Sequence, residues 1–74
     1  MNSFQCRMAR AALDWNIHLL SENSGVHRNT IMKFEKGGEV RDSIITALKL
    51  TFENAGVIFI AENGEGPGVR LKKQ

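Results

Sequence analysis

The sequence predicts a mostly α-helical protein: four to five short helices, two of them joined by a tight turn, followed by a C-terminal β-hairpin or strand. Two observations predict this class. Apolar residues recur at helical spacing as far as about residue 55, with glycines where that spacing is interrupted. After Gly56 the composition changes to β-branched and aromatic residues and then to turn-forming residues.

The first two helices are predicted from their caps and their apolar spacing. Ser3 can cap a helix that runs from about Phe4 to Asp14. Its predicted buried stripe consists of apolar residues at helical spacing: Phe4, Met8, Ala11, Ala12 and Trp15. Asn16 is the next plausible cap, and it opens a short helix over 17–23 that Gly25 can end in a left-handed turn.

Glycines also bound the next two helices. A third helix fits roughly His27 to Lys36 and is closed by Gly37 and Gly38. A fourth helix fits about Asp42 to Asn54, with Gly56 at its end. Its predicted inner face consists of Ile44, Ile45, Leu48 and Phe52.

The chain ends in a predicted β-hairpin. Residues 57–61 are apolar and mostly β-branched or aromatic, residues 63–68 are turn-forming, and residues 69–72 alternate apolar with basic side chains. We expect one domain over residues 1–74, with a helical part at 3–55 and the hairpin at 56–72.

Composition narrows the class of protein without indicating a partner. The net charge is only +2, from 10 basic and 8 acidic residues, so the position of the charges must indicate any partner. Cys6 is the single cysteine, which excludes an internal disulfide and favours a reducing cytoplasm. The longest apolar run is too short to span a membrane, and the N-terminus lacks the pattern of a secretory signal. We expect a cytoplasmic protein.

The sequence contains no catalytic or metal-binding pattern. Cys6, His18 and His27 have neither the spacing of a zinc site nor a third group that would orient a nucleophile. The glycines of residues 63–68 lack the Gly-Lys-Ser/Thr ending of a phosphate-binding loop. We expect no enzymatic activity, no metal and no cofactor.

The third helix carries the most informative pattern. At helical spacing one of its sides is mainly cationic and polar, with Arg28, Asn29, Met32, Lys33 and Lys36. The other side carries Ile31 and Phe34, with Glu35 beside them. One interpretation is a solvated face. The other is a helix in the DNA major groove, where arginine pairs with guanine, asparagine pairs with adenine and lysines neutralise phosphates. The arginine and asparagine lie in the first turn, which favours the second interpretation.

The span from about Arg7 to Phe52 resembles the lambda-repressor-like, Cro-type helix-turn-helix family, also called the XRE family. The residues that carry the resemblance are Ser24-Gly25-Val26, Thr30-Ile31, Phe34-Glu35 and Gly37, with Leu20 and Arg10 at the leucine and arginine of the two preceding helices. The tail, AGVIFIAEN followed by GPGVRLKK, is similar to that of small bacterial regulators in this group.

The resemblance implies roles for the residues around the third helix. It implies base contacts from Arg28, Asn29, Met32 and Lys33. It implies contacts to the DNA backbone from His27, Thr30, Lys36 and Arg41. It also implies a structural ion pair between Arg10 and Glu35, whereas spacing alone offers Arg10 a second partner in Asp14, four residues later.

The second helix departs from the family pattern. Ile17 stands where the family usually has a glutamine that hydrogen-bonds a phosphate, and Leu19 stands where the family is normally polar. Either the two residues extend the core or cover Trp15, which we favour, or they contact another protein.

The hairpin indicates a homodimer. A lone two-stranded hairpin is marginally stable, and an apolar strand with an open edge invites pairing. It can pack on the first and fourth helices of its own chain or pair with the same strand of a second copy, and we expect the second. The expected interface is Val57, Ile58, Phe59 and Ile60, with the outer face of the fourth helix as the alternative. A two-fold dimer would bind half-sites roughly 10 bp apart, or a multiple of that.

Taken together, these patterns predict sequence-specific binding to double-stranded DNA by a homodimer on a palindromic operator, and hence transcriptional regulation. The bacterial or phage setting comes from the resemblance alone. The rival prediction is a protein-interaction module on a helix-turn-helix scaffold, for example antitoxin-like, with DNA binding secondary or absent. Ile17, Leu19 and the hairpin motivate that rival.

Overall fold

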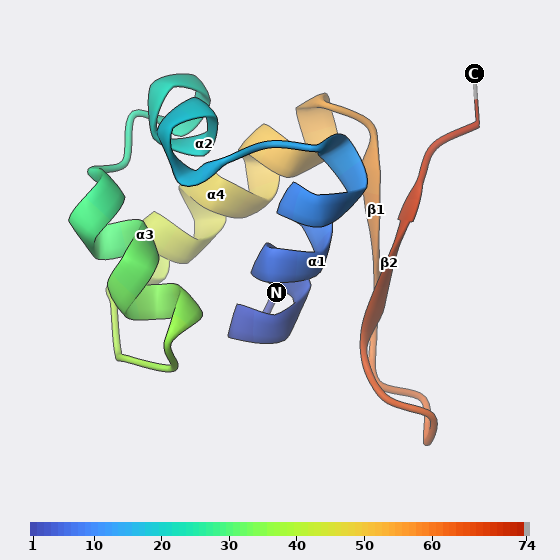
Figure 1. Cartoon of the computed structure of the whole chain (residues 1–74). Helices are drawn as coiled ribbons and strands as arrows, with labels where there is room; N and C mark the ends of the chain where they lie inside the picture. The colour runs from blue at the N-terminus through green and yellow to red at the C-terminus, as the bar shows by residue number, and fades with distance from the viewer. Residues whose placement is uncertain (74) are drawn as a thin grey trace.

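The computed structural model describes residues 1–73, and Gln74, the last residue of the expected domain, lies outside the described residues. In chain order the elements are α1 (Ser3–Leu13), α2 (Ile17–Ser24), α3 (Arg28–Glu35), α4 (Asp42–Asn54), β1 (Val57–Ile60) and β2 (Gly68–Leu71). Figure 1 shows the hairpin beside α1, with α2 and α3 on the other side of that helix and α4 running from α3 to the start of β1. The predicted class, mostly α-helical with a C-terminal β-hairpin, is confirmed.

The ends of α2 and α4 lie close to where local signals predict them. The Asn16 side chain accepts a hydrogen bond from the Leu19 N–H at 2.8 Å and caps α2. Gly25 then ends α2 in the left-handed region, with φ 75°. The bounds of α4, Asp42–Asn54, are those predicted.

The predicted cap of α1 is wrong by one residue. The cap is Asn2, whose Oδ1 accepts a hydrogen bond from the Gln5 N–H at 2.8 Å. Gln5 Oε1 in turn accepts one from the Asn2 N–H at 3.0 Å. This reciprocal capping box satisfies two backbone donors at once, whereas Ser3 as the cap would have Cys6 at the reciprocal position.

The predicted buried stripe of α1 is also wrong. Phe4 is 64% exposed, and Ala11 and Ala12 are exposed too. Of the five predicted residues only Met8 and Trp15 are partly covered. The residues that α1 buries are Gln5, Cys6 and Ala9. Helical spacing predicts that some stripe is buried, but the neighbouring elements decide which one.

Gln5 connects α1 to the hairpin. It is a buried polar residue, 5% exposed, and its Nε2 donates to the carbonyl oxygens of Ile60 at 2.9 Å and Gly68 at 3.1 Å. One amide therefore caps the helix through its oxygen and anchors both strands through its nitrogen. A polar side chain is tolerated in this position because all of these groups are hydrogen-bonded.

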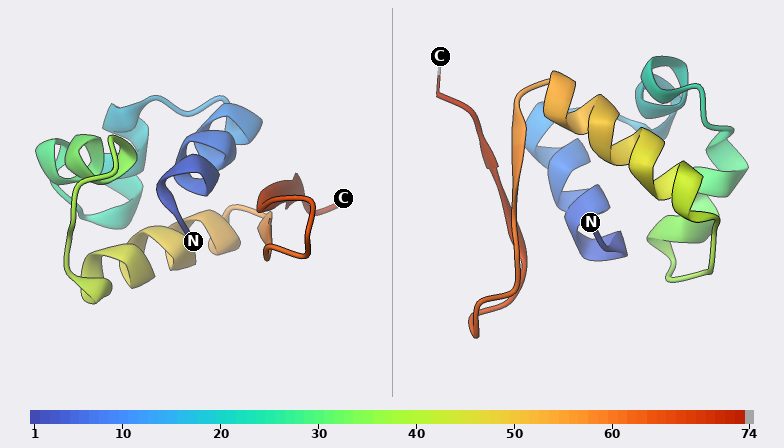
Figure 2. Two further views of the ribbon diagram at one scale, coloured as in Figure 1. Left: turned by 90° about the horizontal axis from the view of Figure 1, so that it is seen from below. Right: turned by 180° about the vertical axis from the view of Figure 1, so that it is seen from behind.

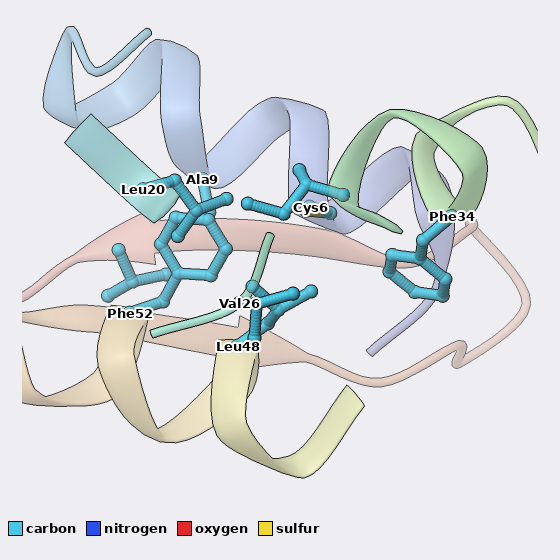
Figure 3. Packing of buried hydrophobic residues seen from close by; sticks show 9 residues of the cluster. Cys6, Ala9, Leu20, Val26, Phe34, Leu48 and Phe52 are labelled. Atoms are coloured by element: carbon cyan, nitrogen blue, oxygen red, sulfur yellow. The ribbon is translucent and has the colours of Figure 1, made fainter. Parts of the chain in front are cut away.

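A single apolar core joins the helices to β1. Its largest fully buried side chains are Phe52, Leu20, Ile31, Leu48 and Cys6. Figure 3 shows Leu48 and Phe52 of α4 facing the α1 residues of this cluster. The Phe52 ring stacks on Trp15 and meets Phe59 edge-on, each at a centroid distance of 6.1 Å. Phe52 therefore links the α1–α2 connection to the hairpin.

The hairpin packs on its own chain. β1 and β2 are antiparallel, with Val57 opposite Leu71 and Phe59 opposite Val69. Val57 is only 3% exposed, and Phe59 packs against the core. The side chains of Val57 and Phe59 therefore contact the core of their own chain, Val57 as a buried and Phe59 as a partly buried residue, and the expected dimer contact at β1 stays a prediction.

The two other expected interface residues differ in exposure. Ile58 is 42% exposed, whereas Ile60 is half-buried. Both views in Figure 2 place the hairpin and α3 at opposite ends of the molecule. Ile58 is therefore an apolar side chain that the hairpin presents to solvent, far from the third helix.

The longest helix within residues 1–73 is α4, with 13 residues. In this part of the chain no helix combines the length and the apolar character needed to cross a membrane.

Candidate nucleic-acid interface

A hydrogen-bonded turn of three residues joins α2 to α3. The Gly25 N–H donates to the Ser21 carbonyl at 2.9 Å and closes α2. The Ser21 hydroxyl donates to the Val26 carbonyl at 2.7 Å, and Ser24 Oγ accepts from the Val26 N–H at 3.1 Å. Both polar groups of Val26 are thus bonded while its side chain is buried, 5% exposed. These bonds hold the two helices in one mutual orientation.

His27 caps α3 through one ring nitrogen. Its Nδ1 accepts a hydrogen bond from the Asn29 N–H at 3.1 Å. A neutral imidazole that accepts at Nδ1 carries its proton on Nε2. His27 is exposed, so it caps the helix and still offers one N–H donor to a ligand at the surface. The sequence places His27 at the cap, but the nitrogen it uses is visible only in the structure.

The two faces of α3 are those that helical spacing predicts. Ile31, Phe34 and Glu35 are buried. The predicted base-contact residues Arg28, Asn29, Met32 and Lys33 are all exposed, Met32 by 38%. Of the predicted backbone contacts, His27, Lys36 and Arg41 are exposed and Thr30 is half-buried. All eight predicted contact residues therefore lie on α3, at its N-terminal cap or in the connection that follows it.

The inward side of α3 is held by an ion pair between buried Glu35 and partly buried Arg10. Arg10 donates from Nε to Glu35 Oε2 at 2.7 Å and from Nη2 to Glu35 Oε1 at 2.6 Å. The pair is therefore bidentate, and of the two partners that the sequence allows for Arg10 the structure contains Glu35 and not Asp14. Arg10 also donates to the Trp15 carbonyl at 3.3 Å. These bonds join α1 to α3 and to Trp15, which lies in the connection between α1 and α2.

Cys6 completes the environment of Glu35. Its thiol is fully buried and donates to Glu35 Oε2 at 3.2 Å. Burial raises the pKa of the Cys6 thiol far above its usual range, and the hydrogen bond to Glu35 adds to this. The hydrogen bonds with Glu35 likewise raise the pKa of Arg10. Cys6 therefore stays a neutral thiol and lacks the character of a nucleophile.

A pair of glycines ends α3. The Gly37 N–H donates to the Phe34 carbonyl at 3.0 Å, and the Gly38 N–H donates to the Lys33 carbonyl at 2.9 Å. Gly37 has a φ of 89°, so this is a Schellman motif with glycine at the left-handed position. At Gly38 a Cβ would lie 2.7 Å from Lys33 Cγ. The Lys33 side chain therefore lies against the backbone of Gly38, a contact that no sequence pattern indicated.

Ile17 and Leu19, the two α2 residues that differ from the pattern of the similar family, differ in their burial. Ile17 is partly buried and packs against the core, which is one of the two roles considered for it. Leu19 is 37% exposed. Ile17 therefore contacts the core of its own chain, and Leu19 remains on the surface.

Within residues 1–73 no group of three or more His, Cys, Asp or Glu side chains is arranged to hold a metal ion. The fold and this surface define a small helical domain in which two short helices are joined by a tight turn and the second helix exposes a cationic, polar face. No protein-family model matches the sequence, and no curated protein shows significant similarity to it.

Proposed function

We propose that this protein binds double-stranded DNA in a sequence-specific manner and regulates transcription, with α3 lying in the major groove. The observation that carries the proposal is the exposure of Arg28 and Asn29 in the first turn of a rigidly held helix. The N-terminal residues of a recognition helix face the base edges. α3 also lies at one end of the molecule, as Figure 2 shows, where a duplex can approach it.

The side chains on this face match the chemistry of base recognition. Arg28 offers a bidentate fork to guanine, and Asn29 offers a bidentate pair to adenine. Met32 has an apolar surface for a thymine methyl group. The Nε2–H of His27 and the ammonium of Lys36 are placed at the two ends of α3, where they can bind backbone phosphates.

The resemblance to the lambda-repressor-like, Cro-type family supports this proposal. The residues that the family uses to hold the third helix are here engaged as the family would require: Leu20, Ile31 and Phe34 are buried, and Arg10 pairs with Glu35. The resemblance also supports a bacterial or phage regulator that acts in the cytoplasm.

The regulator acts as a homodimer on a palindromic operator. The hairpin and α3 lie at opposite ends of the molecule, so a second copy bound at the hairpin leaves both α3 helices free for DNA. Exposed Ile58 and the outer edge of β1 are one candidate interface, and exposed Leu50 on α4 marks the other. A two-fold axis relates two half-sites roughly 10 bp apart, or a multiple of that.

Selection of bound duplexes from a random DNA pool tests this function. A palindrome in the selected sequences is the expected result. In a subsequent mobility-shift titration, Arg28→Ala should weaken binding by about 1–3 kcal/mol and relax the preference at one base pair. Lys72→Ala removes a positive charge from the hairpin end and should leave that preference unchanged. A pool without enriched sequences would refute sequence-specific binding.

Exposed apolar residues favour a second candidate, a module that binds another protein. Leu19 on α2 is 37% exposed and Phe4 on α1 is 64% exposed. If this is the main function, the chain should bind duplexes weakly and without preference at about 100 mM salt, where non-specific contacts are screened. The mobility-shift titration at two salt concentrations separates the two candidates.

A further inference from the structure

An open groove separates α3 from the start of α4. It has a volume of about 590 Å³ and is lined by Thr30, Lys33, Glu39, Val40, Arg41 and Ile44. Figure 2 shows the connection that joins α3 to α4 at the end of the molecule opposite the hairpin. The groove is continuous with the exposed face of α3, because two of its lining residues belong to that helix.

Two cations without partners converge on this groove. The ion pairs found among residues 1–73 are Arg10 with Glu35 and His18 with Glu22, so neither Lys33 nor Arg41 is neutralised within this part of the chain. Glu39 also lines the groove but forms no ion pair there with either cation. Two positive groups and one carboxylate leave an excess of one positive charge. A phosphodiester carries one negative charge and matches that excess.

Gly38 determines the course of the Lys33 side chain toward the groove. A Cβ at Gly38 would lie 2.7 Å from Lys33 Cγ, 2.9 Å from the Lys33 carbonyl oxygen and 3.4 Å from Lys33 Cε. The aliphatic stem thus follows the backbone of Gly38 instead of extending along the first turns of α3. Lys33 thereby lines the same groove as Arg41.

We propose that this groove binds one backbone phosphate of duplex DNA. Lys33 and Arg41 supply the charges, the Thr30 hydroxyl supplies a further donor, and Gly38 is a positioning residue for Lys33. The proposal rests on the proposed function and changes one role within it: Lys33 contacts a phosphate and not a base. Arg28, Asn29 and Met32 then carry the base readout.

The decisive test pairs Lys33 with one phosphate. The full chain is titrated with fluorescent duplexes of the selected site in which each backbone linkage in turn is an uncharged methylphosphonate. At one linkage the neutral group should weaken duplex binding by the wild-type protein and leave duplex binding by the Lys33→Ala variant unchanged. Between about 50 and 200 mM salt one phosphate contact changes the affinity about threefold, so Lys33→Ala should flatten the salt dependence by that amount.

Gly38→Ala provides the second variant. Its new Cβ should displace the Lys33 stem, weaken binding as Lys33→Ala does, and add no further loss when the two are combined. Gly37→Ala is the matched control, because it strains a residue with φ 89° while a Cβ there has no neighbour within 4 Å. Circular dichroism checks that each variant is folded. Glu39→Gln should strengthen binding, since it removes the carboxylate from the groove.

The outcomes separate the groove from the function on which it rests. If Lys33→Ala relaxes the preference at one base pair and no linkage shows the coupling, Lys33 reads a base and the phosphate assignment is overturned. If the wild-type chain binds duplexes without sequence preference, the proposed function fails, while the phosphate contact of Lys33 is still tested by whether Lys33→Ala flattens the salt dependence of binding. If the wild-type chain does not bind duplexes at about 50 mM salt, both proposals are overturned.

Discussion

Replacement of Arg10 by leucine tests the contact that holds α3 against α1. The substitution removes both hydrogen bonds from Arg10 to Glu35 and leaves the Cys6 thiol as the donor to that carboxylate. Glu35 is only 7% exposed, so water replaces the lost donors poorly. An orphaned buried charge costs about 3–5 kcal/mol. Because the Arg10 side chain is 21% exposed and water can enter where it lay, we expect the lower end, about 3 kcal/mol.

That loss is large for a chain of this size. A domain of 74 residues has a free energy of unfolding of roughly 4–11 kcal/mol. A loss of about 3 kcal/mol should lower the midpoint of thermal unfolding by roughly 12–24 °C. Glu35→Leu should cost less than Arg10→Leu, because the guanidinium that it leaves unpaired can reach water. The double variant Arg10→Leu with Glu35→Leu should recover most of the loss, since neither charge is then orphaned.

Urea and thermal unfolding followed by circular dichroism measure all four proteins of this cycle. The slope of the free energy against urea concentration should be unchanged, so that the shift in midpoint reports stability alone. The reasoning is refuted if Arg10→Leu costs less than about 1 kcal/mol, or if the double variant is no more stable than Arg10→Leu.

Three further predictions follow from single residues. Asp14 ends α1 with a φ of 56°, so Asp14→Gly should raise the free energy of unfolding by about 0.5–1 kcal/mol, as urea titration would measure. Cys6 should react with iodoacetamide only as fast as the chain unfolds, since burial raises its pKa and excludes the reagent; mass spectrometry at increasing urea tests this. Hydrogen bonds from the Gly66 and Gly64 N–H groups lower the pKa of Glu62. The stability that the ionised Glu62 carboxylate contributes is therefore present above its ordinary pKa of 4.5, and it is lost as the pH falls through the lower pKa of the folded state. In NMR titrations those two amide signals should shift in that range, and Glu62→Gln should abolish the shift.

The sequence was sufficient to predict those helix ends and faces that depend only on residues nearby in the chain. Asn16 and Gly25 predicted the ends of α2, and the bounds of α4 were predicted in full. The inward side of α3 was predicted from spacing, because Ile31 and Phe34 recur at an interval that helical geometry alone sets. The switch to strands after Gly56 was likewise predicted from composition.

Contacts between distant segments were not predictable in the same way. α1 offered an apolar stripe with Phe4, yet the residues it buries include Gln5 and Cys6, because their partners lie in the hairpin and in α3. The sequence offered Arg10 two partners, and only the packing of α1 against α3 decided for Glu35. The side chains of Val57 and Phe59 were expected at a dimer contact, and in the folded chain Val57 is buried in its own core and Phe59 packs against that core.

The sequence by itself therefore determined the elements, their order and the polar face of α3, since these follow from interactions within a few residues. The tertiary structure alone decided which face of α1 is buried, where the hairpin packs and how Lys33 lies against Gly38 at the groove that Arg41 also lines. The physical reason is that close packing selects among side-chain arrangements that local spacing leaves equally possible.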